Sequence, residues 1–416
     1  MPPAASPSAP PVPEVGAVVA APGSSSPIYG PNPGAIVVAI DPGHGGCLDW
    51  GVPNPWDNTQ ANAEKTSTLE IALQLRDRLR AAGVSVAMSR DTDEAIAGDN
   101  YPPQGCDGAP FRDVNGDGVA GFGPDLPEGT LARDELQARI DRANLARADV
   151  LLSIHINSFV DGDGEPIQIA ASQTFYTDET AWGAASAELA TDVQSGAVAG
   201  LSGAPYPRQD RGTEAKNFYI VAPPLFELTV ERPDPWKQPA RGALMPAVLS
   251  EVGSISLQAE ATSLGDPATQ AALADGLFDG LATWFAARPL AVHWSIDGEA
   301  MLQPVPGDGP PFWASTQPAT SVLVTLTNTG TRTWPADVRL LRGWEVSDDP
   351  YLRRAPALDG LAVDLPQLRA GESVTTELPI DPPPDERAVA WIDLEVGGQR
   401  LSEIGSAALQ LATTPR

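Results

Sequence analysis

The sequence predicts an α/β domain, with a mixed, largely parallel sheet that has helices on both faces, followed by an all-β sandwich. Residues 1–33 are rich in proline, alanine and serine and cannot bury a core, so we expect a disordered tether there. Between residues 34 and 288, short aliphatic runs alternate with amphipathic stretches, which is typical of a largely parallel sheet covered by helices. Residues 290–416 contain alternating strand-like runs and no long helical period, which indicates a β-sandwich accessory domain.

Each element of the α/β part is predicted from its own local pattern. The β-branched and aliphatic run 36–40 is typical of a buried strand. Segment 63–82 has apolar residues at helical spacing, and Gly83 after it is a common helix stop. The other predicted strands are 84–88, 150–156, 174–176 and 243–250, and the other predicted helices are 131–147, 182–198 and 267–287.

Two segments interrupt this alternation. Residues 94–130 and 202–240 are rich in glycine, proline, aspartate and asparagine, and both are long for connections in a compact domain. Such segments are usually functional loops, disordered segments or cleft walls, and the sequence leaves open whether they gate a cleft.

The C-terminal region has fewer clear strands. Segments 322–328, 374–380 and 388–396 alternate in the way strands do, and a proline triplet at 382–384 separates the last two. Five tryptophans lie in this region, and we expect Trp334 and Trp391 to pack in its core.

Composition restricts the partners. The chain of 416 residues has 26 basic and 54 acidic side chains, a net charge of −28, which disfavours nucleic acids and anionic membrane surfaces. Its apolar runs are far shorter than the roughly 20 residues that span a bilayer. Residues 1–33 have no basic start or apolar core typical of a signal peptide. Cys47 and Cys106 could form one disulfide or remain two buried thiols.

Two of the three histidines follow predicted strands. His44 lies in a glycine-rich turn just after strand 36–40, and His155 lies at the end of strand 150–156. Glu251 is expected just beyond strand 243–250, and Glu64 at the start of the first helix. Because ligands gather at the carboxyl ends of strands in open α/β sheets, we expect these four side chains to converge.

Two histidines and a glutamate form a known ligand set for catalytic zinc, which keeps one position open for water. A second glutamate beside such a site can transfer protons. Glu70 is the rival third ligand, but it lies further into the helix and is expected to face solvent. His293 lies beyond the α/β part, where we expect a structural role.

These residues stand within an ordered series of motifs. The series is Asp41-Pro-Gly-His44-Gly-Gly46, Glu64-Lys65 with Leu69 and Ala72, Ser89-Arg-Asp-Thr-Asp93, Arg139 with Ala143-Asn144, Ala148-Asp149, Ser153-Ile-His155-Ile-Asn157 and Pro246-Ala-Val-Leu-Ser-Glu251-Val-Gly253. Over residues 35–288 it resembles the zinc-dependent N-acetylmuramoyl-L-alanine amidases of the amidase-3 type. The resemblance implies that His44, Glu64 and His155 bind Zn²⁺ and that Glu251 is the catalytic carboxylate. It also implies an α/β sandwich around a mixed sheet.

The chain departs from this family after its last glutamate. The family usually has a Gly-Phe-Leu-Ser-Asn-like run there, and this chain has Gly253-Ser-Ile-Ser-Leu257. Segment 94–130 is also longer than in compact members, so the shape of the cleft is expected to differ.

A second metal signal lies inside the first long segment. Asp113, Asn115 and Asp117 alternate as oxygen ligands do at the start of a Ca²⁺ loop, with glycine at the turn. The twelfth position holds Pro124 where the full pattern has glutamate. A solvated acidic turn is therefore the competing interpretation.

The C-terminal region carries one motif of its own. Asn328-Thr-Gly-Thr-Arg-Thr-Trp334-Pro335 resembles the immunoglobulin-like domain of the neighbour-of-BRCA-one type, which implies an immunoglobulin-like sandwich.

The resemblances together imply an exported peptidoglycan hydrolase in the cell wall or periplasm. It would cleave the amide between N-acetylmuramic acid and L-alanine of the stem peptide with zinc-activated water. Peptidoglycan or muropeptides are the expected partners, and the C-terminal domain would contact other wall components. Two alternatives remain open: a zinc-retaining wall-binding protein with little or no turnover, and a metal-dependent amidase for another amide.

Overall fold

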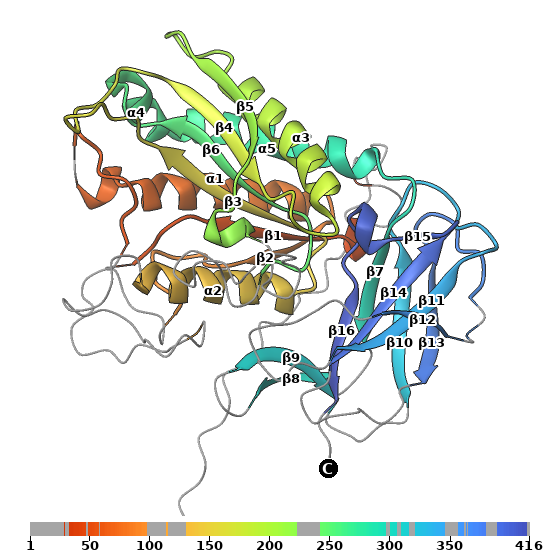
Figure 1. Ribbon diagram of the computed structural model, residues 1–416. Helices are drawn as coiled ribbons and strands as arrows, with labels where there is room; N and C mark the ends of the chain where they lie inside the picture. Colours follow the sequence, from red (N-terminus) through yellow and green to blue (C-terminus); the bar gives the residue numbers. More distant parts are fainter. Residues whose placement is uncertain are drawn as a thin grey trace, which may run out of the picture.

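The computed structural model places an α/β part and a C-terminal β part side by side (Figure 1). It describes residues 29, 33–46, 49–57, 59–97, 114, 130–222, 242–296, 300–305, 309–315, 321–345, 357–361, 363, 365–379 and 389–413. Cys47, Cys106 and the calcium candidates Asp113, Asn115 and Asp117 lie outside the described residues, as do most of segment 94–130 and residues 223–240 of the second long segment. Within the predicted tether, Tyr29 is described: it is buried, and its hydroxyl donates to the carbonyl of Phe278 at 2.8 Å.

The α/β part is built on a mixed sheet. Its described strands run in the order β2-β1-β3-β6-β4-β5. Strands β2, β1, β3 and β6 are parallel, whereas β4 is antiparallel to β6 and parallel to β5, which confirms the predicted mixed, largely parallel sheet. The strands are β1 (Val37–Pro42), β2 (Ser85–Met88), β3 (Val150–Asn157), β4 (Ala171–Tyr176), β5 (Gln209–Ala215) and β6 (Ala247–Ser254).

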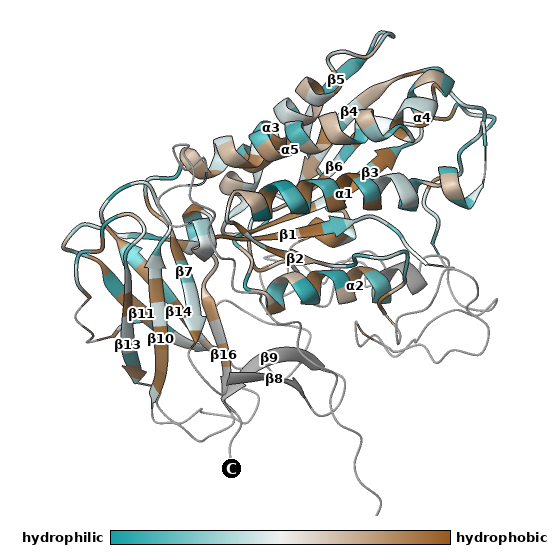
Figure 2. Ribbon diagram, turned by 180° about the vertical axis from the view of Figure 1, so that it is seen from behind, coloured by the Kyte–Doolittle hydropathy of each residue, from teal (hydrophilic) through white to brown (hydrophobic). Residues whose placement is uncertain are grey.

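Helices cover both faces of this sheet. The helices are α1 (Glu64–Ala81), α2 (Thr130–Leu145), α3 (Gly183–Gly200), α4 (Gln258–Leu264) and α5 (Pro267–Ala286), with short 3-10 turns at η1 (Pro33–Ala35), η2 (Gln60–Asn62) and η3 (Tyr219–Val221). Helices α1, α3 and α5 pack on the face that presents Val38 and Leu152, whereas α2 and η3 pack on the face that presents Ala39 and Leu151. Figure 2 shows the apolar β1 and β3 between helices that carry hydrophilic residues. In the described part of the chain, no helix combines the length and apolar character needed to cross a membrane.

One prediction about the sheet was wrong, and two elements of the α/β part were missed. Glu251 was expected beyond its strand, but it is the fifth residue of β6, because pairing with β4 extends to Glu251 and pairing with β3 continues past it to Ser254. Strand β5 and helix α4 were not predicted. All seven residues of β5 are exposed or only half-buried, so this edge strand has no apolar alternation for a pattern to reveal.

The C-terminal part contains no α-helix among its described residues and forms two sheets. One has the order β13-β10-β7, and the other has the order β12-β11-β14-β16-β9-β8 with β15 beside β14. Both Trp334 and Trp391 are buried, as predicted. The elements are β7 (Val292–Ile296), β8 (Ala300–Val305), β9 (Gly309–Ser315), β10 (Ser321–Asn328), β11 (Arg339–Glu345), β12 (Asp359–Gly360), β13 (Ser373–Pro379), β14 (Val389–Val396), β15 (Gln399–Arg400), η5 (Ser402–Ile404) and β16 (Leu409–Thr413).

Arg288 joins the two parts. Its buried guanidinium donates to Gly405 O at 2.8 Å and to Ser406 Oγ at 3.2 Å, and it lies 4.1 Å from the centre of the Trp284 ring. Nearby, His293 Nδ1 lies 3.6 Å from Asp149 Oδ2. Asp149 directly precedes β3, so these contacts lie at the amino-terminal end of that strand, whereas His155 lies near its carboxyl end. His293 is thus outside the cluster that contains His155, in agreement with the structural role expected from the sequence.

A buried ion pair holds the turn that carries His44. Arg139 of α2 donates to Asp41 Oδ1 at 2.7 Å and to the carbonyl of His44 at 2.6 Å. The hydroxyls of Ser89 and Ser153 also donate to Asp41. Burial alone would raise the pKa of Asp41, but Arg139 and these hydroxyls lower it to about 2. The motifs that carry the family resemblance therefore meet at the base of this turn.

Replacing Arg139 by methionine is expected to destabilise the fold by about 3–5 kcal/mol, because Asp41 would remain buried without its partner. Denaturant unfolding at neutral pH measures this change. Arg76→Met is the matched control: Arg76 pairs with the exposed Asp77 on the surface of α1, and such pairs contribute under about 1 kcal/mol. Equal losses in the two variants would contradict the prediction.

The ionised Asp41 also makes stability depend on pH. Its contribution to the free energy of unfolding should be complete above about pH 4 and be lost at lower pH, because the pKa of an unfolded aspartate is about 3.9.

Candidate metal centre

Four side chains predicted from the sequence lie at one edge of the sheet. His44 follows β1, His155 is the sixth residue of β3, and Glu64 is the first residue of α1. Glu251 of β6 is the register partner of His155. The turn after β1, the start of α1 and the ends of two parallel strands therefore meet, because the carboxyl ends of parallel strands lie at the same edge.

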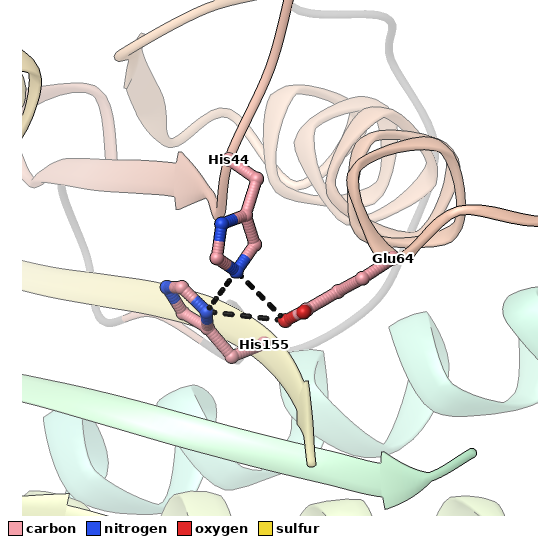
Figure 3. Close-up of side chains that lie close together, drawn as sticks. All are labelled: His44, Glu64 and His155. Atoms are coloured by element: carbon pink, nitrogen blue, oxygen red, sulfur yellow. Dashed lines mark hydrogen bonds and ion pairs between the residues drawn. The ribbon is translucent and has the colours of Figure 1, made fainter. Parts of the chain in front are cut away.

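Three of these side chains point at one another (Figure 3). His44 Nε2 lies 3.1 Å from Glu64 Oε1 and 3.1 Å from His155 Nδ1, and His155 Nδ1 lies 3.2 Å from Glu64 Oε1. The three atoms thus form a nearly equilateral triangle. Among the described residues, this is the cluster of histidine and carboxylate side chains whose donor atoms could hold a metal ion.

The triangle fits a tetrahedral metal ion. Zinc bonds to nitrogen and oxygen are about 2.0–2.1 Å long, so two ligand atoms of a tetrahedral ion lie about 3.3 Å apart. The observed separations of 3.1, 3.1 and 3.2 Å are close to this value. Hydrogen bonds cannot satisfy all three contacts at once. If one of the two imidazole nitrogens carries a proton, the other nitrogen and the carboxylate oxygen are two acceptors that face each other. Two imidazoles and one carboxylate are also a donor set that zinc accepts.

Glu64 is fixed by backbone donors. Its Oε2 accepts from the amide of Val52 at 2.8 Å, and its Oε1 accepts from the amide of Ile156 at 2.8 Å. Burial alone would raise the pKa of Glu64, but His44 and His155 lower it strongly, so the carboxylate is ionised. An ionised and immobilised carboxylate is the form that binds a metal ion.

Glycines allow the close approach of these side chains. A Cβ on Gly43 would lie 2.6 Å from His155 Nε2, and a Cβ on Gly51 would collide with Glu64 and lie 2.8 Å from His44 Cδ2. His44 itself has φ 61°, the left-handed region that non-glycine residues rarely adopt. Such a backbone conformation is often retained at functional sites despite its cost, and the bonds of Arg139 hold it here.

Asp49 orients His44 from behind. Its Oδ2 lies 2.8 Å from His44 Nδ1, the nitrogen that faces away from the triangle. Burial would lower the pKa of His44, but Glu64 and Asp49 raise it to about 10. The same carboxylates favour a metal cation at this place, and a carboxylate behind a histidine ligand fixes its tautomer.

Glu251 lies beside the triangle. Its Oε2 is buried and has no hydrogen-bond partner in the described part of the chain. Burial and the charge of Glu64 raise the pKa of Glu251 well above its usual range, and His44 and Lys216 oppose that shift. Gln173 of β4 is its register partner on the other side. A carboxyl group whose pKa is raised is suited to exchanging protons near neutral pH.

The rival ligand from the sequence lies away from the site, and other residues that were not predicted lie close to it. Glu70 is exposed on α1 and is absent from the triangle, as the sequence predicts. Asp49, Gln173 and Lys216 are neighbours of the site that the sequence did not suggest. Asp49 stands eight residues after Asp41 of β1, and no pattern in the sequence shows that its carboxylate contacts the imidazole of His44.

The chain is similar to known amidases. Residues 38–283 match the Amidase_3 family, described as N-acetylmuramoyl-L-alanine amidase. The uncharacterized protein YqiI of Bacillus subtilis (strain 168) is 24% identical over 248 residues, covering 60% of this chain and 84% of that protein. The germination-specific N-acetylmuramoyl-L-alanine amidase of the same organism is 25% identical over 253 residues, covering 61% of this chain and 81% of that protein.

A solved structure is also similar. The N-acetylmuramoyl-L-alanine amidase from Clostridium difficile 630 is 25% identical and has a TM-score of 0.40, with 61% of this chain and 98% of that chain covered. The family match spans more than half of the sequence and contains all four residues of the site. The chain therefore belongs to the Amidase_3 family and is an N-acetylmuramoyl-L-alanine amidase, a hydrolase of peptidoglycan.

Proposed function

We propose that this amidase is zinc-dependent and that His44, Glu64 and His155 hold the metal. The observation that supports this assignment best is the triangle of their three donor atoms, with sides of 3.1–3.2 Å. The substrate bond is the amide between the lactyl group of N-acetylmuramic acid and L-alanine of the stem peptide. When bound, zinc would polarise the lactyl carbonyl and lower the pKa of a water molecule to about 7.

Glu251 is the proton-transfer residue in this proposal. Its carboxylate takes a proton from the attacking water as the new carbon–oxygen bond forms, and delivers it to the L-alanine nitrogen as the carbon–nitrogen bond breaks. An amide anion is a poor leaving group, so this protonation is required. The position of Glu251 in register with His155, with an unpaired buried oxygen, supports this role.

His44 and His155 act as neutral ligands, and Asp49 keeps the ring of His44 oriented. Glu64 cannot share the proton-transfer role, because two backbone amides and the histidines already hold its carboxylate oxygens. The two glutamates thus differ in function because their surroundings differ.

We further propose that residues 290–416 form an immunoglobulin-like accessory domain that positions the exported enzyme on the wall. The contacts of Arg288 and His293 support a role outside the chemistry, because they lie at the edge of the sheet opposite the site. A tether in residues 1–33 and a calcium site at Asp113, Asn115 and Asp117 remain further proposals from the sequence.

Digestion of purified peptidoglycan, followed by mass analysis, tests the proposed reaction. The soluble products are expected to be stem peptides with a free L-alanine amino terminus, and the glycan strands should remain long. A chelator should abolish the release of peptides, and added Zn²⁺ should restore it. Release of disaccharides, or of peptides cut within the stem, would contradict the assigned bond.

A further inference from the structure

Most of the large exposed apolar side chains follow the two strands that lead to the metal centre. Among the described residues, the exposed large hydrophobic side chains are Trp50, Trp56, Val160, Ile167 and Leu323. Four of these five lie in the turns that follow β1 and β3, the strands that lead to His44 and His155. Leu323 alone lies in the C-terminal part, on β10.

Trp50 stands directly next to the proposed ligands. It precedes Gly51, whose Cα approaches Glu64 and His44 so closely that a Cβ would collide with them. The carbonyl of Trp50 accepts from the amide of Lys65 at 3.3 Å, and the Lys65 ammonium lies 5.1 Å from the centre of the Trp50 ring. Lys65 is fully buried, so the indole covers it on one side while 37% of Trp50 remains exposed.

Trp56 is anchored by hydrogen bonds of its side chain and its backbone. Its Nε1 donates to the carbonyl of Ile255 at 2.9 Å, and its backbone amide donates to Asn54 Oδ1 at 3.0 Å. Ile255 directly follows β6, the strand of Glu251, and its amide donates to the carbonyl of Asn157 at the end of β3. The indole is therefore tied to the same sheet edge as the metal centre although 37% of Trp56 is exposed.

These two indoles have the properties of a binding platform. Each is exposed on a fixed side chain, so binding a flat ligand face costs little conformational entropy. Trp50 and Trp56 lie within the connection between His44 and Glu64, which makes them continuous with the centre where the scissile amide must lie.

We propose that Trp50 and Trp56 form the subsite for sugar rings of the glycan strand beside the scissile bond. This inference rests on the proposed function, because the lactyl group places the muramic acid ring within a few bonds of the carbonyl that is attacked. Sugar rings present an apolar C–H face that stacks on an indole.

A neutral glycan strand is compatible with the negative charge of the protein. In uncleaved peptidoglycan the lactyl carboxyl is tied up in the amide, so the glycan backbone is neutral. A protein with a net charge of −28 would repel an anionic polymer but not a neutral one. Hydrolysis creates a lactyl carboxylate, so the cleaved strand should bind this subsite more weakly than the uncleaved strand.

Calorimetric titration of the full-length chain with the neutral N-acetylglucosamine tetramer tests the proposal. Neither this tetramer nor the free stem peptide, which serves as a second titrant, contains the scissile amide, so turnover does not interfere with the measurement. Trp50→Ala and Trp56→Ala are each expected to weaken tetramer binding roughly tenfold, with Trp→Phe replacements retaining most of the affinity and peptide binding unchanged. Leu323→Ala is the matched control, because it removes an exposed apolar side chain far from the site.

Three results of the titrations would overturn the subsite: no measurable tetramer binding, equal tetramer affinity in all variants, or a selective loss of peptide affinity in the tryptophan variants. A change of sedimentation in Trp56→Ala would instead assign the indole to contact with a second copy and would also overturn it. Replacing Trp50 by alanine uncovers Lys65 and could impair folding. The Trp→Phe variants keep an aromatic ring at each position, so they still test binding in that case. Binding is measured without catalysis, so a failure of amide cleavage would refute the proposed function and leave the tetramer result interpretable.

Discussion

Replacing Glu251 by glutamine is expected to lower kcat by on the order of 10²-fold or more, while zinc content and the fold stay unchanged. Glutamine has nearly the same shape as glutamate but cannot take a proton from water or deliver one to the leaving nitrogen. Glu251 is not needed to complete the triangle of His44, Glu64 and His155, so its replacement should spare the metal. Release of stem peptides and the zinc content of the purified variant measure both effects.

Glu70→Gln is the control for this variant. Glu70 is an exposed glutamate on α1 and was the rival ligand in the sequence, so its replacement should leave kcat within about twofold, as for other surface positions. Near-normal peptide release by Glu251→Gln would show that another group moves the proton. Loss of zinc together with activity would show instead that Glu251 is a ligand.

Replacing His155 by alanine is expected to remove the metal and with it the activity. The zinc content should fall from about one ion per chain to near zero after dialysis, because two donors cannot hold the ion as three do. The fold should survive, since His155 faces the triangle and the core contacts of β3 come from Val150, Leu152 and Ile154. Elemental analysis of the dialysed protein measures the metal, and circular dichroism checks the fold.

His293→Ala is the control for this prediction. The sequence has three histidines, and His293 lies at the opposite edge of the sheet, so its removal should leave about one zinc per chain. Full zinc occupancy in a His44→Ala, His155→Ala double variant would refute the assigned ligands.

The elements that hold the site could be predicted because their patterns are strong. Strands β1 and β3 have β-branched and aliphatic runs, and α1 has a clear helical period with a glycine stop. His155 lies on β3, Glu64 begins α1 and His44 directly follows the end of β1, so their convergence could be predicted from strand direction. The buried tryptophans of the C-terminal part were also predicted, because a large aromatic side chain is most often found in a core.

Other features have no local signal. Strand β5 is an exposed edge, so its residues show no period. The position of Glu251 inside β6 depends on backbone pairing that continues through a run of small and polar residues. Asp49 and the two exposed indoles owe their roles to the path of the chain between His44 and Glu64, which no periodic pattern specifies.

Anomalous scattering from a crystal of the full-length protein at the zinc edge is the most direct test of the metal centre. The proposed function predicts one strong peak within bonding distance of His44 Nε2, Glu64 Oε1 and His155 Nδ1, with Glu251 close by but not bonded to it. A zinc-loaded crystal whose only peak lies elsewhere, or whose peak is bonded to Glu251 in place of Glu64, would contradict it.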